Sequence, residues 1–248
     1  MITSVKNPAI KLLRSLKTKK GRRETGLCLI EGERLVFDAA ASGAVFDTAL
    51  VSSERPDLRE RLDNAGIACI EAPETVLRAV CDTETPQGVC AAVRANETEP
   101  PEEYPHGLVV ALDTVQDPGN LGTVLRTADA FGAAGVLVGL GGADPYSAKA
   151  LRAAMGSTFH LPVWQGELQP ELIKLKNAGY SLVCGHLEGA ETLPEMGDDR
   201  VLIIGNEANG VSDETAGIAY RYRLPMKGRA ESLNAAAAAA ILIYKLSE

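Results

Sequence analysis

The sequence has no long hydrophobic run, few aromatic residues and no cysteine pattern, and each absence excludes a class of protein. Its 248 residues contain no apolar stretch near the roughly 20 residues that a membrane-spanning helix needs. Five scattered cysteines form no CxxC pair and three histidines add no metal-ligand spacing. This argues against a zinc site or a disulfide framework, and it favours a reducing, cytoplasmic compartment. With four Phe, six Tyr and one Trp, an exposed aromatic sheet that stacks bases is not expected.

Charge is distributed unevenly along the chain. The formal net charge is −8, from 25 Lys and Arg against 33 Asp and Glu, and taken alone it argues against a polyanionic partner. Residues 1–23, however, contain eight cations and no acid. Such an asymmetry indicates contact with nucleic acid or a membrane surface. We favour a phosphate-facing surface over a solvated helix face.

Short apolar runs alternate with helical patterns in the first 94 residues, which is typical of an α/β domain. Asn7-Pro8 predicts the start of a helix that Gly21 ends. The later strands are predicted at 27–30, 49–52, 67–70 and 89–93, and the helices at 33–42, 56–65 and 74–80. A stretch rich in Pro and acid at 95–107 then predicts a linker between a domain at 1–94 and a second domain at 108–248.

The second domain shows the same alternation. Residues 108–112 form an apolar run typical of a buried parallel strand. Further strands are predicted at 136–138, 181–184 and 201–204, and helices at 121–131 and 231–246. The last of these helices contains six consecutive alanines, and alanine is the best helix former. The fold class is therefore α/β throughout.

Three polar segments follow predicted strands, where open α/β sheets bind ligands. Residues 117–126 predict a tight turn, with Asn120 as the helix cap and Arg126 off the apolar stripe and free to face a ligand. Residues 205–210 follow the strand at 201–204 directly. Residues 224–234 place an apolar Leu-Pro-Met wall beside Ser and Asn, which suits a ligand with an apolar sulfur-bearing part and a polar head. Alone, the first segment is better explained as a capped helix with a surface arginine. The second can be a loop capped by Ser212, and in the third Ser232 or Asn234 can be merely a helix cap.

Together, in this order and spacing, the three segments resemble the SpoU (TrmH-like) family of RNA ribose 2′-O-methyltransferases, in the SPOUT superfamily. The matching text is DPGNLGTVLRTADAFGA at 117–133, VLIIGNEANGVSDE at 201–214 and LPMKGRAESLNAAAAAAILIY at 224–244. The first half is similar to the family's substrate-binding domain through NPAIKLLRSLKTKKGRRETGLCLIEGERLV, which begins at Asn7, and TPQGVCAAV at 85–93.

The resemblance implies a ribosomal-protein-like α/β RNA-binding domain followed by an α/β SPOUT domain with a deep trefoil knot. It implies a homodimer that uses S-adenosylmethionine to methylate a ribose 2′-hydroxyl of structured RNA, with ribosomal RNA favoured over transfer RNA. The implied catalytic residues are Asn120, Arg126, Glu207, Ser232 and Asn234. The implied cofactor contacts are His186, Leu187, Gly205, Glu207, Leu224, Met226, Ser232, Leu233 and Asn234. The cations assigned to RNA binding are Lys6, Lys11, Lys17, Lys19, Lys20, Arg22 and Arg23.

Arg126 matches the arginine that is often assigned as the base in this family. Because a guanidinium stays protonated at neutral pH, we prefer a role in stabilising the developing alkoxide and the adjacent phosphate, with deprotonated arginine as the alternative. Relatives often carry a serine soon after the arginine of the loop at 152–157. This chain has Ala154 there, so we assign the loop no catalytic role.

Three other interpretations stay open at this point. The first is a non-catalytic RNA-binding protein that retains the fold. The second is an NAD enzyme, because GLGG at 139–142 follows a predicted strand, although Asp144 stands where the dinucleotide fingerprint requires a small residue. The third is a nucleophile pair of Cys184 and His186, for which no third group is identifiable.

Overall fold

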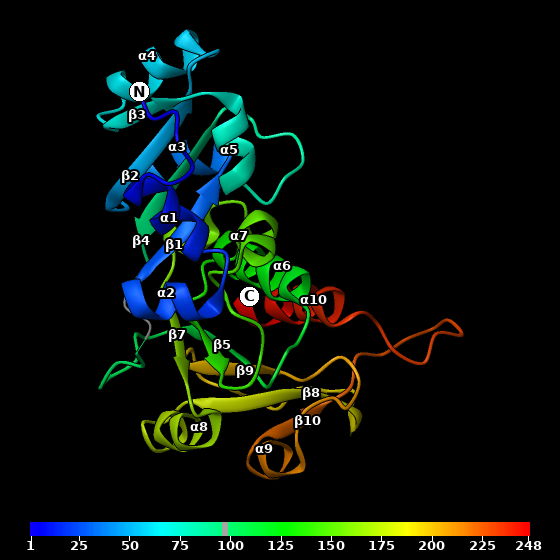
Figure 1. Cartoon of the computed structure of the whole chain (residues 1–248). Coiled ribbons are helices and arrows are strands. Elements are labelled where there is room, and N and C mark those ends of the chain that lie inside the picture. Colours follow the sequence, from blue (N-terminus) through cyan, green and yellow to red (C-terminus); the bar gives the residue numbers. More distant parts are fainter. Residues whose placement is uncertain (96–98) are drawn as a thin grey trace. The chain divides into compact units, whose positions relative to one another are not determined.

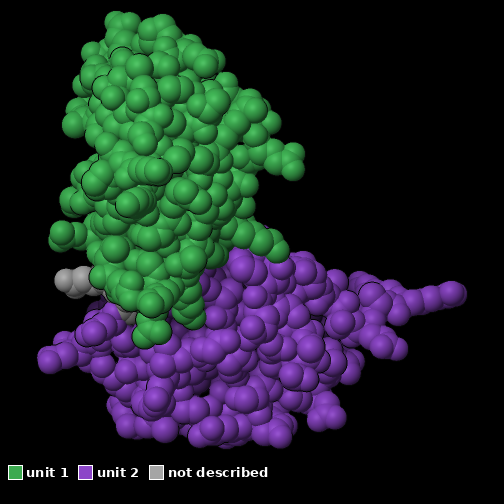
Figure 2. Space-filling model, viewed as in Figure 1, with its two compact units in different colours: residues 1–96, 146–159 green, residues 97–145, 160–248 purple. Residues whose placement is uncertain are grey.

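The computed structural model describes residues 1–95 and 99–248, which form two compact units (Figure 1). The first unit comprises residues 1–95 together with Tyr146–Phe159, and the second comprises residues 99–145 and His160–Glu248 (Figure 2). Residues 96–98 of the predicted linker lie outside the described residues. The segment Tyr146–Phe159 therefore belongs by its contacts to the first unit, although the chain has by then entered the second.

The first unit is built on a four-stranded mixed sheet. Its strand order is β1 (Leu27–Glu31), β4 (Val89–Arg94), β2 (Phe46–Ser52) and β3 (Cys69–Ala72). Only the β2–β3 pair is parallel among the described pairs. Both faces of the sheet are covered. Val89, Ala91 and Val93 of β4 pack into one hydrophobic cluster, whereas Cys90 and Ala92 pack into the other.

Helices cover the two faces of this sheet. One face carries α1 (Pro8–Ser15) and α5 (Glu74–Val80), and the other carries α3 (Glu33–Ala41), α4 (Pro56–Asn64) and α7 (Ala148–Ala154), followed by the 3-10 turn η1 (Ser157–Phe159). α5 matches the predicted helix residue for residue. Leu151, on α7, and Phe159, on η1, are buried in the same cluster as the α3 side chains.

The predicted single helix ending at Gly21 is wrong. The chain forms α1 and then a second helix, α2 (Lys19–Thr25), whose N-cap Thr18 accepts a hydrogen bond from the Gly21 N–H. Gly21 lies inside α2 because its missing side chain permits a close approach: a Cβ there would lie 2.1 Å from the carbonyl oxygen of Ser15. Glycine is therefore required at position 21 by the close packing of Ser15, and it does not end the helix.

The second unit contains a six-stranded sheet in which every described pair of strands is parallel. The strand order is β10 (Tyr220–Tyr222), β8 (Ser181–Ala190), β9 (Arg200–Ile204), β5 (Leu108–Leu112), β6 (Gly135–Gly139) and β7 (Val163–Gly166). All five residues of β5 are buried, as expected for a central parallel strand that is covered on both faces. The predicted α/β class is confirmed for this unit.

Helices flank both faces of the parallel sheet. Figure 1 shows α6 (Pro118–Ala130) and α10 (Ala235–Ser247) on one face and α8 (Leu168–Asn177) and α9 (Asp213–Ile218) on the other. The helix predicted from residue 231 begins only at Ala235. The Asn234 side chain accepts hydrogen bonds from the N–H groups of Ala236 and Ala237, so Asn234 is the cap and Ser232 lies outside the helix.

The described part of the predicted linker packs against the second unit. The ring of Tyr104 meets Trp164 edge to face at 5.1 Å between centroids, and its hydroxyl donates to Glu171 at 2.9 Å. The Tyr180 hydroxyl donates to the carbonyl of Pro105 at 2.8 Å. Residues 99–107 are therefore held along α8 by specific contacts. Among the described helices, none is both long and apolar enough to cross a bilayer.

Candidate functional site

The order of the strands in the parallel sheet creates a position where the loops that follow two adjacent strands lead to opposite sides of the sheet. From β5 the chain proceeds to β6 and β7 on one side, whereas β9, β8 and β10 lie on the other side. The switch point therefore falls between the adjacent strands β5 and β9. Ligands in open α/β sheets bind outside the carboxyl ends of the strands at such a point. The loops that follow these strands, 113–117 and 205–212, carry the first two polar segments.

The carboxylate of Glu207 joins these two loops. Its Oε2 accepts the N–H of Gln116 at 3.0 Å, and its Oε1 accepts the N–H of Asp117 at 3.1 Å and the amide Nδ2 of Asn120 at 2.9 Å. Partial burial raises the pKa of Glu207, but these hydrogen bonds outweigh it and lower the pKa below its ordinary value. Glu207 is thus held as a carboxylate that fixes the 113–120 segment.

Asn120 extends the network to the third segment. Its Oδ1 accepts the amide Nδ2 of Asn234 at 3.0 Å, so a directed chain of donors runs from Asn234 through Asn120 to Glu207. The prediction that Asn120 caps the helix is wrong. Asp117 is the N-cap of α6, and its Oδ1 accepts the N–H groups of Gly119 and Asn120. The amide of Asn120 is therefore free to link the three segments.

Thr114 occupies a strained backbone position beside this network. Its φ of +56° is an outlier for a β-branched residue. The carbonyl of Thr114 accepts two side-chain amides, from Gln116 at 3.1 Å and from Asn206 at 3.0 Å. Gln116 also donates to the carbonyl of Gly141 at 2.9 Å. Side chains from two loops therefore hold the strained segment in place.

Asp113, a buried acid that directly follows β5, anchors the 205–212 loop. Its Oδ2 accepts both the N–H and the hydroxyl of Ser212, at 2.9 and 2.8 Å. Ser212 is also the N-cap of α9, because its side chain accepts the N–H of Thr215. The loop closes tightly on itself, because a Cβ on Gly205 would lie 2.1 Å from the carbonyl carbon of Gly210. Only glycine fits there.

Several of the remaining predicted cofactor residues expose large apolar side chains to solvent. Leu187 on β8 is 62% exposed, and Leu233 and Met226 in the 224–234 segment are 40% and 38% exposed. His186 is partly buried, and its Nδ1 accepts the N–H of Glu188 at 3.1 Å. Large apolar side chains left open to solvent near polar loops fit a ligand with an apolar part. The segment therefore suits S-adenosylmethionine, which combines polar and charged groups with the apolar surfaces of its methylene groups and adenine faces.

Two predicted catalytic residues stand apart from the network. Arg126 is exposed on α6, six residues and about 9 Å along the helix axis from Asn120. Ser232 is exposed ahead of α10. Within the described residues, neither side chain forms a hydrogen bond or an ion pair. Both groups are therefore available to a ligand or to another chain.

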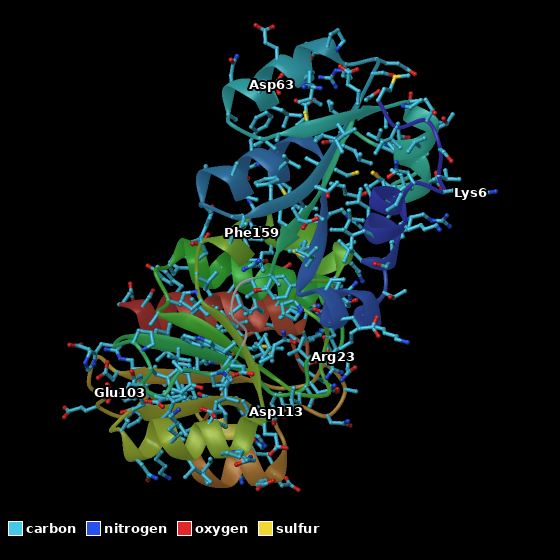
Figure 3. All side chains as sticks on the ribbon, turned by 60° about the vertical axis from the view of Figure 1, so that its left-hand side comes forward. Lys6, Arg23, Asp63, Glu103, Asp113 and Phe159 are labelled. Atoms are coloured by element: carbon cyan, nitrogen blue, oxygen red, sulfur yellow. The ribbon has the colours of Figure 1, made fainter. Side chains whose placement is uncertain are left out.

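The structure divides the predicted RNA-binding cations into two groups. Lys17 donates to the carbonyl of Cys81 at 2.7 Å and pairs with Asp82, and Arg22 donates to the carbonyl of Leu16 at 2.7 Å. Lys17 therefore fastens the end of α1 to the segment after α5, and Arg22 ties α2 to the end of α1. Lys20 forms an exposed pair with Glu24. Within the described residues the others have no side-chain partner, and Lys6 points away from the surface in Figure 3. The unpartnered cations of the predicted set are Lys6, Lys11, Lys19 and Arg23.

Sequence reasoning missed Asp113 and Gln116, which lie outside the predicted segments, and gave no role to Asp117 and Asn206, which lie within them. A signal existed for Asp117, because Asp before Pro is a common helix start. The side chains of Asp113, Gln116 and Asn206 bond mostly to backbone N–H and carbonyl groups. Every residue has such groups, so no residue type marks these partners in a sequence.

The geometry removes support from two of the alternatives. Gly141 and Gly142 pack beside Thr114 and Val115, and the next helix, α7, begins only at Ala148, so no dinucleotide-binding turn forms there. Cys184 is fully buried, and burial raises the pKa of its thiol to about 11, which leaves little of the reactive thiolate. Among the described residues, no group of His, Cys, Asp and Glu is placed to hold a metal ion.

Comparisons with known proteins agree with the three-segment pattern. Residues 107–244 match the SpoU rRNA Methylase family, and residues 7–91 match an MRM3-like substrate binding domain. The chain is 39% identical to the 23S rRNA (guanosine(2553)-2′-O)-methyltransferase RlmP of Bacillus subtilis, with 99% of this chain and 98% of that protein covered. It is 31% identical to the 23S rRNA (uridine(2479)-2′-O)-methyltransferase of Streptomyces viridochromogenes, with 93% and 85% covered. The AdoMet-bound rRNA methyltransferase from Sinorhizobium meliloti superposes with a TM-score of 0.86 at 34% identity, over 99% of this chain and 96% of that one.

Proposed function

Because the chain belongs to the SpoU rRNA methylase family, we propose that it transfers a methyl group from S-adenosylmethionine to a ribose 2′-hydroxyl of ribosomal RNA. The observation that carries the proposal is the hydrogen-bonded chain Asn234–Asn120–Glu207, which ties all three family segments together at the switch point of the sheet. A fold retained for RNA binding alone would not need this arrangement of amides and carboxylate.

The cofactor site consists of the loop after β9, the end of β8 and the 224–234 segment. When bound, S-adenosylmethionine supplies a methyl group that is activated by its sulfonium charge. Leu224, Met226 and Leu233 contribute apolar surface, and backbone groups at Gly205 and in the 224–234 segment contribute polar contacts. Ser232 and Asn234 sit at the polar end of the same segment.

Arg126 acts on the RNA. A guanidinium is a cation, and Arg126 has no partner within the described residues, so it stabilises the negative charge that develops on the attacking 2′-oxygen and the neighbouring phosphate. Glu207 is a positioning residue, because its carboxylate accepts hydrogen bonds from the protein's own donors. Asn120 retains one donor hydrogen and one lone pair beyond its two bonds, which allows it to orient the ribose.

The cationic helices α1 and α2 supply RNA affinity. Neutralising unpartnered Lys19 and Arg23 is expected to weaken binding and to reduce the salt slope by about one per lost phosphate contact. Lys17→Ala and Arg22→Ala serve as contrasts, since those cations bond the domain itself and their loss lowers stability instead. Binding of rRNA fragments measured across salt concentrations separates the two. An unchanged slope after neutralising Lys19 and Arg23 would remove the arm from the RNA interface.

The exposed apolar face of α6 and α10 supports a homodimer. Phe131 and Tyr244 are 42% and 52% exposed, and their rings contact at 5.5 Å between centroids. Ile241, one turn before Tyr244, is 46% exposed on the same face of α10. A second copy of this chain would cover this face. The trefoil knot and the cytoplasmic location remain predictions.

The proposal is tested by mapping 2′-O-methyl marks on total RNA from cells with and without the gene. Loss of one mark from ribosomal RNA, restored by the wild-type gene but not by an Arg126→Ala gene, supports the proposal and identifies the nucleotide. An unchanged map would favour the non-catalytic RNA-binding alternative.

A further inference from the structure

The first unit contains a cavity that the proposed chemistry does not use. It lies where β1 meets α3, beside the loop at 83–87 and the helix α7, and its volume is about 290 Å³. Every lining residue belongs to the first unit. This volume is at the lower end of the ~300–1,000 Å³ typical of small-molecule sites, so the cavity has room for one small group.

The walls of the cavity combine apolar and neutral polar surface. Leu35, Leu151 and Met155 provide the apolar part, and Thr85 and Gln87, both exposed to solvent, provide the neutral polar part. Within the described residues, neither Thr85 nor Gln87 has a hydrogen-bond partner for its side chain. A Cβ on Gly32 would come 2.7 Å from the Gln87 oxygen, so glycine at this position leaves space for the amide.

The charged groups of the lining neutralise one another. Glu31, whose side chain is only 7% exposed, pairs with Arg152 at 2.6 Å, and its second oxygen accepts the N–H of Asp82 at 2.9 Å. Arg34 lies near Asp38, at 3.8 Å. The four charges sum to zero, and the buried carboxylate has its partners inside the protein. The cavity therefore suits an uncharged ligand with apolar faces and a polar edge.

We propose that this cavity holds one unpaired nucleobase of the RNA substrate. A nucleobase is neutral, flat and apolar on its faces, and its edge carries the donors and acceptors that Thr85 and Gln87 can match. Single-stranded bases of RNA are commonly splayed out into such pockets and read at their edges. Arg34 also lines the cavity, and its side chain is 70% exposed, which allows it to contact the phosphate of the same nucleotide. The inference rests on the proposed function, because it takes RNA as the substrate.

The proposal gives the 146–159 segment a role. The loop at 152–157 has no catalytic assignment, yet Arg152 of α7 secures the buried Glu31 and Leu151 forms a wall of the cavity. The segment leaves the methyltransferase half of the chain and completes a binding pocket of the RNA-binding unit.

The test closes the cavity at its opening with Gln87→Trp and compares it with Asn64→Trp, a matched polar-to-Trp change at the exposed end of α4. With total ribosomal RNA from cells lacking the gene, Gln87→Trp is expected to raise KM for RNA by roughly tenfold, the effect of losing one bound base, with kcat at saturating RNA unchanged. S-adenosylmethionine affinity and the melting temperature should match those of Asn64→Trp. Equal KM values for the two variants would overturn the proposal.

A second measurement does not depend on a variant that folds. The methyl group of labelled Met155 is followed by NMR in the wild-type protein. The protein is titrated either with the rRNA fragment that contains the nucleotide to be methylated or with free nucleosides. A shift with the fragment, and a weaker one with nucleosides, supports the proposal. A shift with nucleosides alone would indicate a metabolite site and overturn it, as would no shift at all. If the wild-type protein transfers no methyl group to ribosomal RNA, the proposed function fails instead, and the two failures are distinguishable.

Discussion

Replacing Asn120 with Asp tests the direction of the hydrogen-bonded network. The two side chains have nearly the same shape, but Asp lacks the Nδ2 donor that Glu207 accepts at 2.9 Å. In its place an oxygen faces the Oε1 of Glu207. The acceptor for Asn234 is retained, because Oδ1 has an equivalent in Asp. The variant therefore changes one donor into an acceptor and leaves the rest of the site intact.

The size of the effect follows from the distance. Two unit charges 2.9 Å apart repel by about 1.4 kcal/mol at the dielectric constant of water and by about 6 kcal/mol at an effective value of about 20. Since one pKa unit corresponds to about 1.4 kcal/mol, the pair holds a shared proton up to roughly one to four pH units above an ordinary carboxyl. That range extends from about pH 5 to about pH 8.

The sign of the pH dependence is opposite to that of an ordinary surface acid. The pair's folded-state pKa is raised above its unfolded value, so its stabilising bridge is present below the unfolded pKa and is lost as pH rises through the folded pKa. When the proton is bound, Asp donates to Glu207 and restores the bridge. We therefore expect Asn120→Asp to be nearly inactive at alkaline pH and to recover as the pH falls.

Single-turnover methyl transfer to rRNA, measured from pH 5.5 to 9, checks this expectation. The relevant quantity is the rate of Asn120→Asp divided by the wild-type rate at each pH, because the reaction itself depends on pH. Asn120→Ala, which cannot regain a donor, is the control and should show a constant low ratio. A ratio for Asn120→Asp that does not change with pH, whether high or low, would refute the role assigned to the Asn120–Glu207 bond.

Three further outcomes are expected. Arg126→Ala should retain S-adenosylmethionine affinity in calorimetry and lose about 10²-fold or more in methyl transfer, and near-normal turnover would contradict its role. Ser212→Ala should lower the free energy of unfolding in urea by about 1–2 kcal/mol, because Asp113 loses a donor and α9 loses its cap, whereas Ser247→Ala should change little. The pKa of Glu207 is lowered, so its contribution to stability should be complete above pH about 4.5 and be lost as pH falls through the folded-state pKa. The free energies of unfolding of the wild type and Glu207→Gln should therefore converge in acid, and a difference that persists there would oppose this role.

Residue patterns were sufficient where local chemistry decides the structure. The apolar run at 108–112 became β5 without a change of boundary, and 74–80 became α5. The pattern failed where a residue served a tertiary purpose. Gly21 is inside a helix because Ser15 packs against it. The last helix begins at Ala235 rather than at the predicted residue 231, because Asn234 caps it.

The site shows the same division. The family resemblance pointed to Asn120, Glu207 and Asn234, and the structure joins these three by hydrogen bonds. The backbone N–H groups that hold Glu207 and the strained turn at Thr114 were not predictable, because backbone donors carry no residue signature and strain depends on neighbours distant in the sequence. The packing of residues 146–159 with the first unit was not predictable either, because it depends on contacts with residues distant in the sequence.

Methyl transfer to the ribose is measured by incubating the purified protein with methyl-labelled S-adenosylmethionine and ribosomal RNA from cells lacking the gene, then digesting the RNA to nucleosides. We expect label in a single 2′-O-methylnucleoside, and at least about 100-fold less of it with Arg126→Ala. Label on a base, or no label in RNA that the protein demonstrably binds, would contradict it.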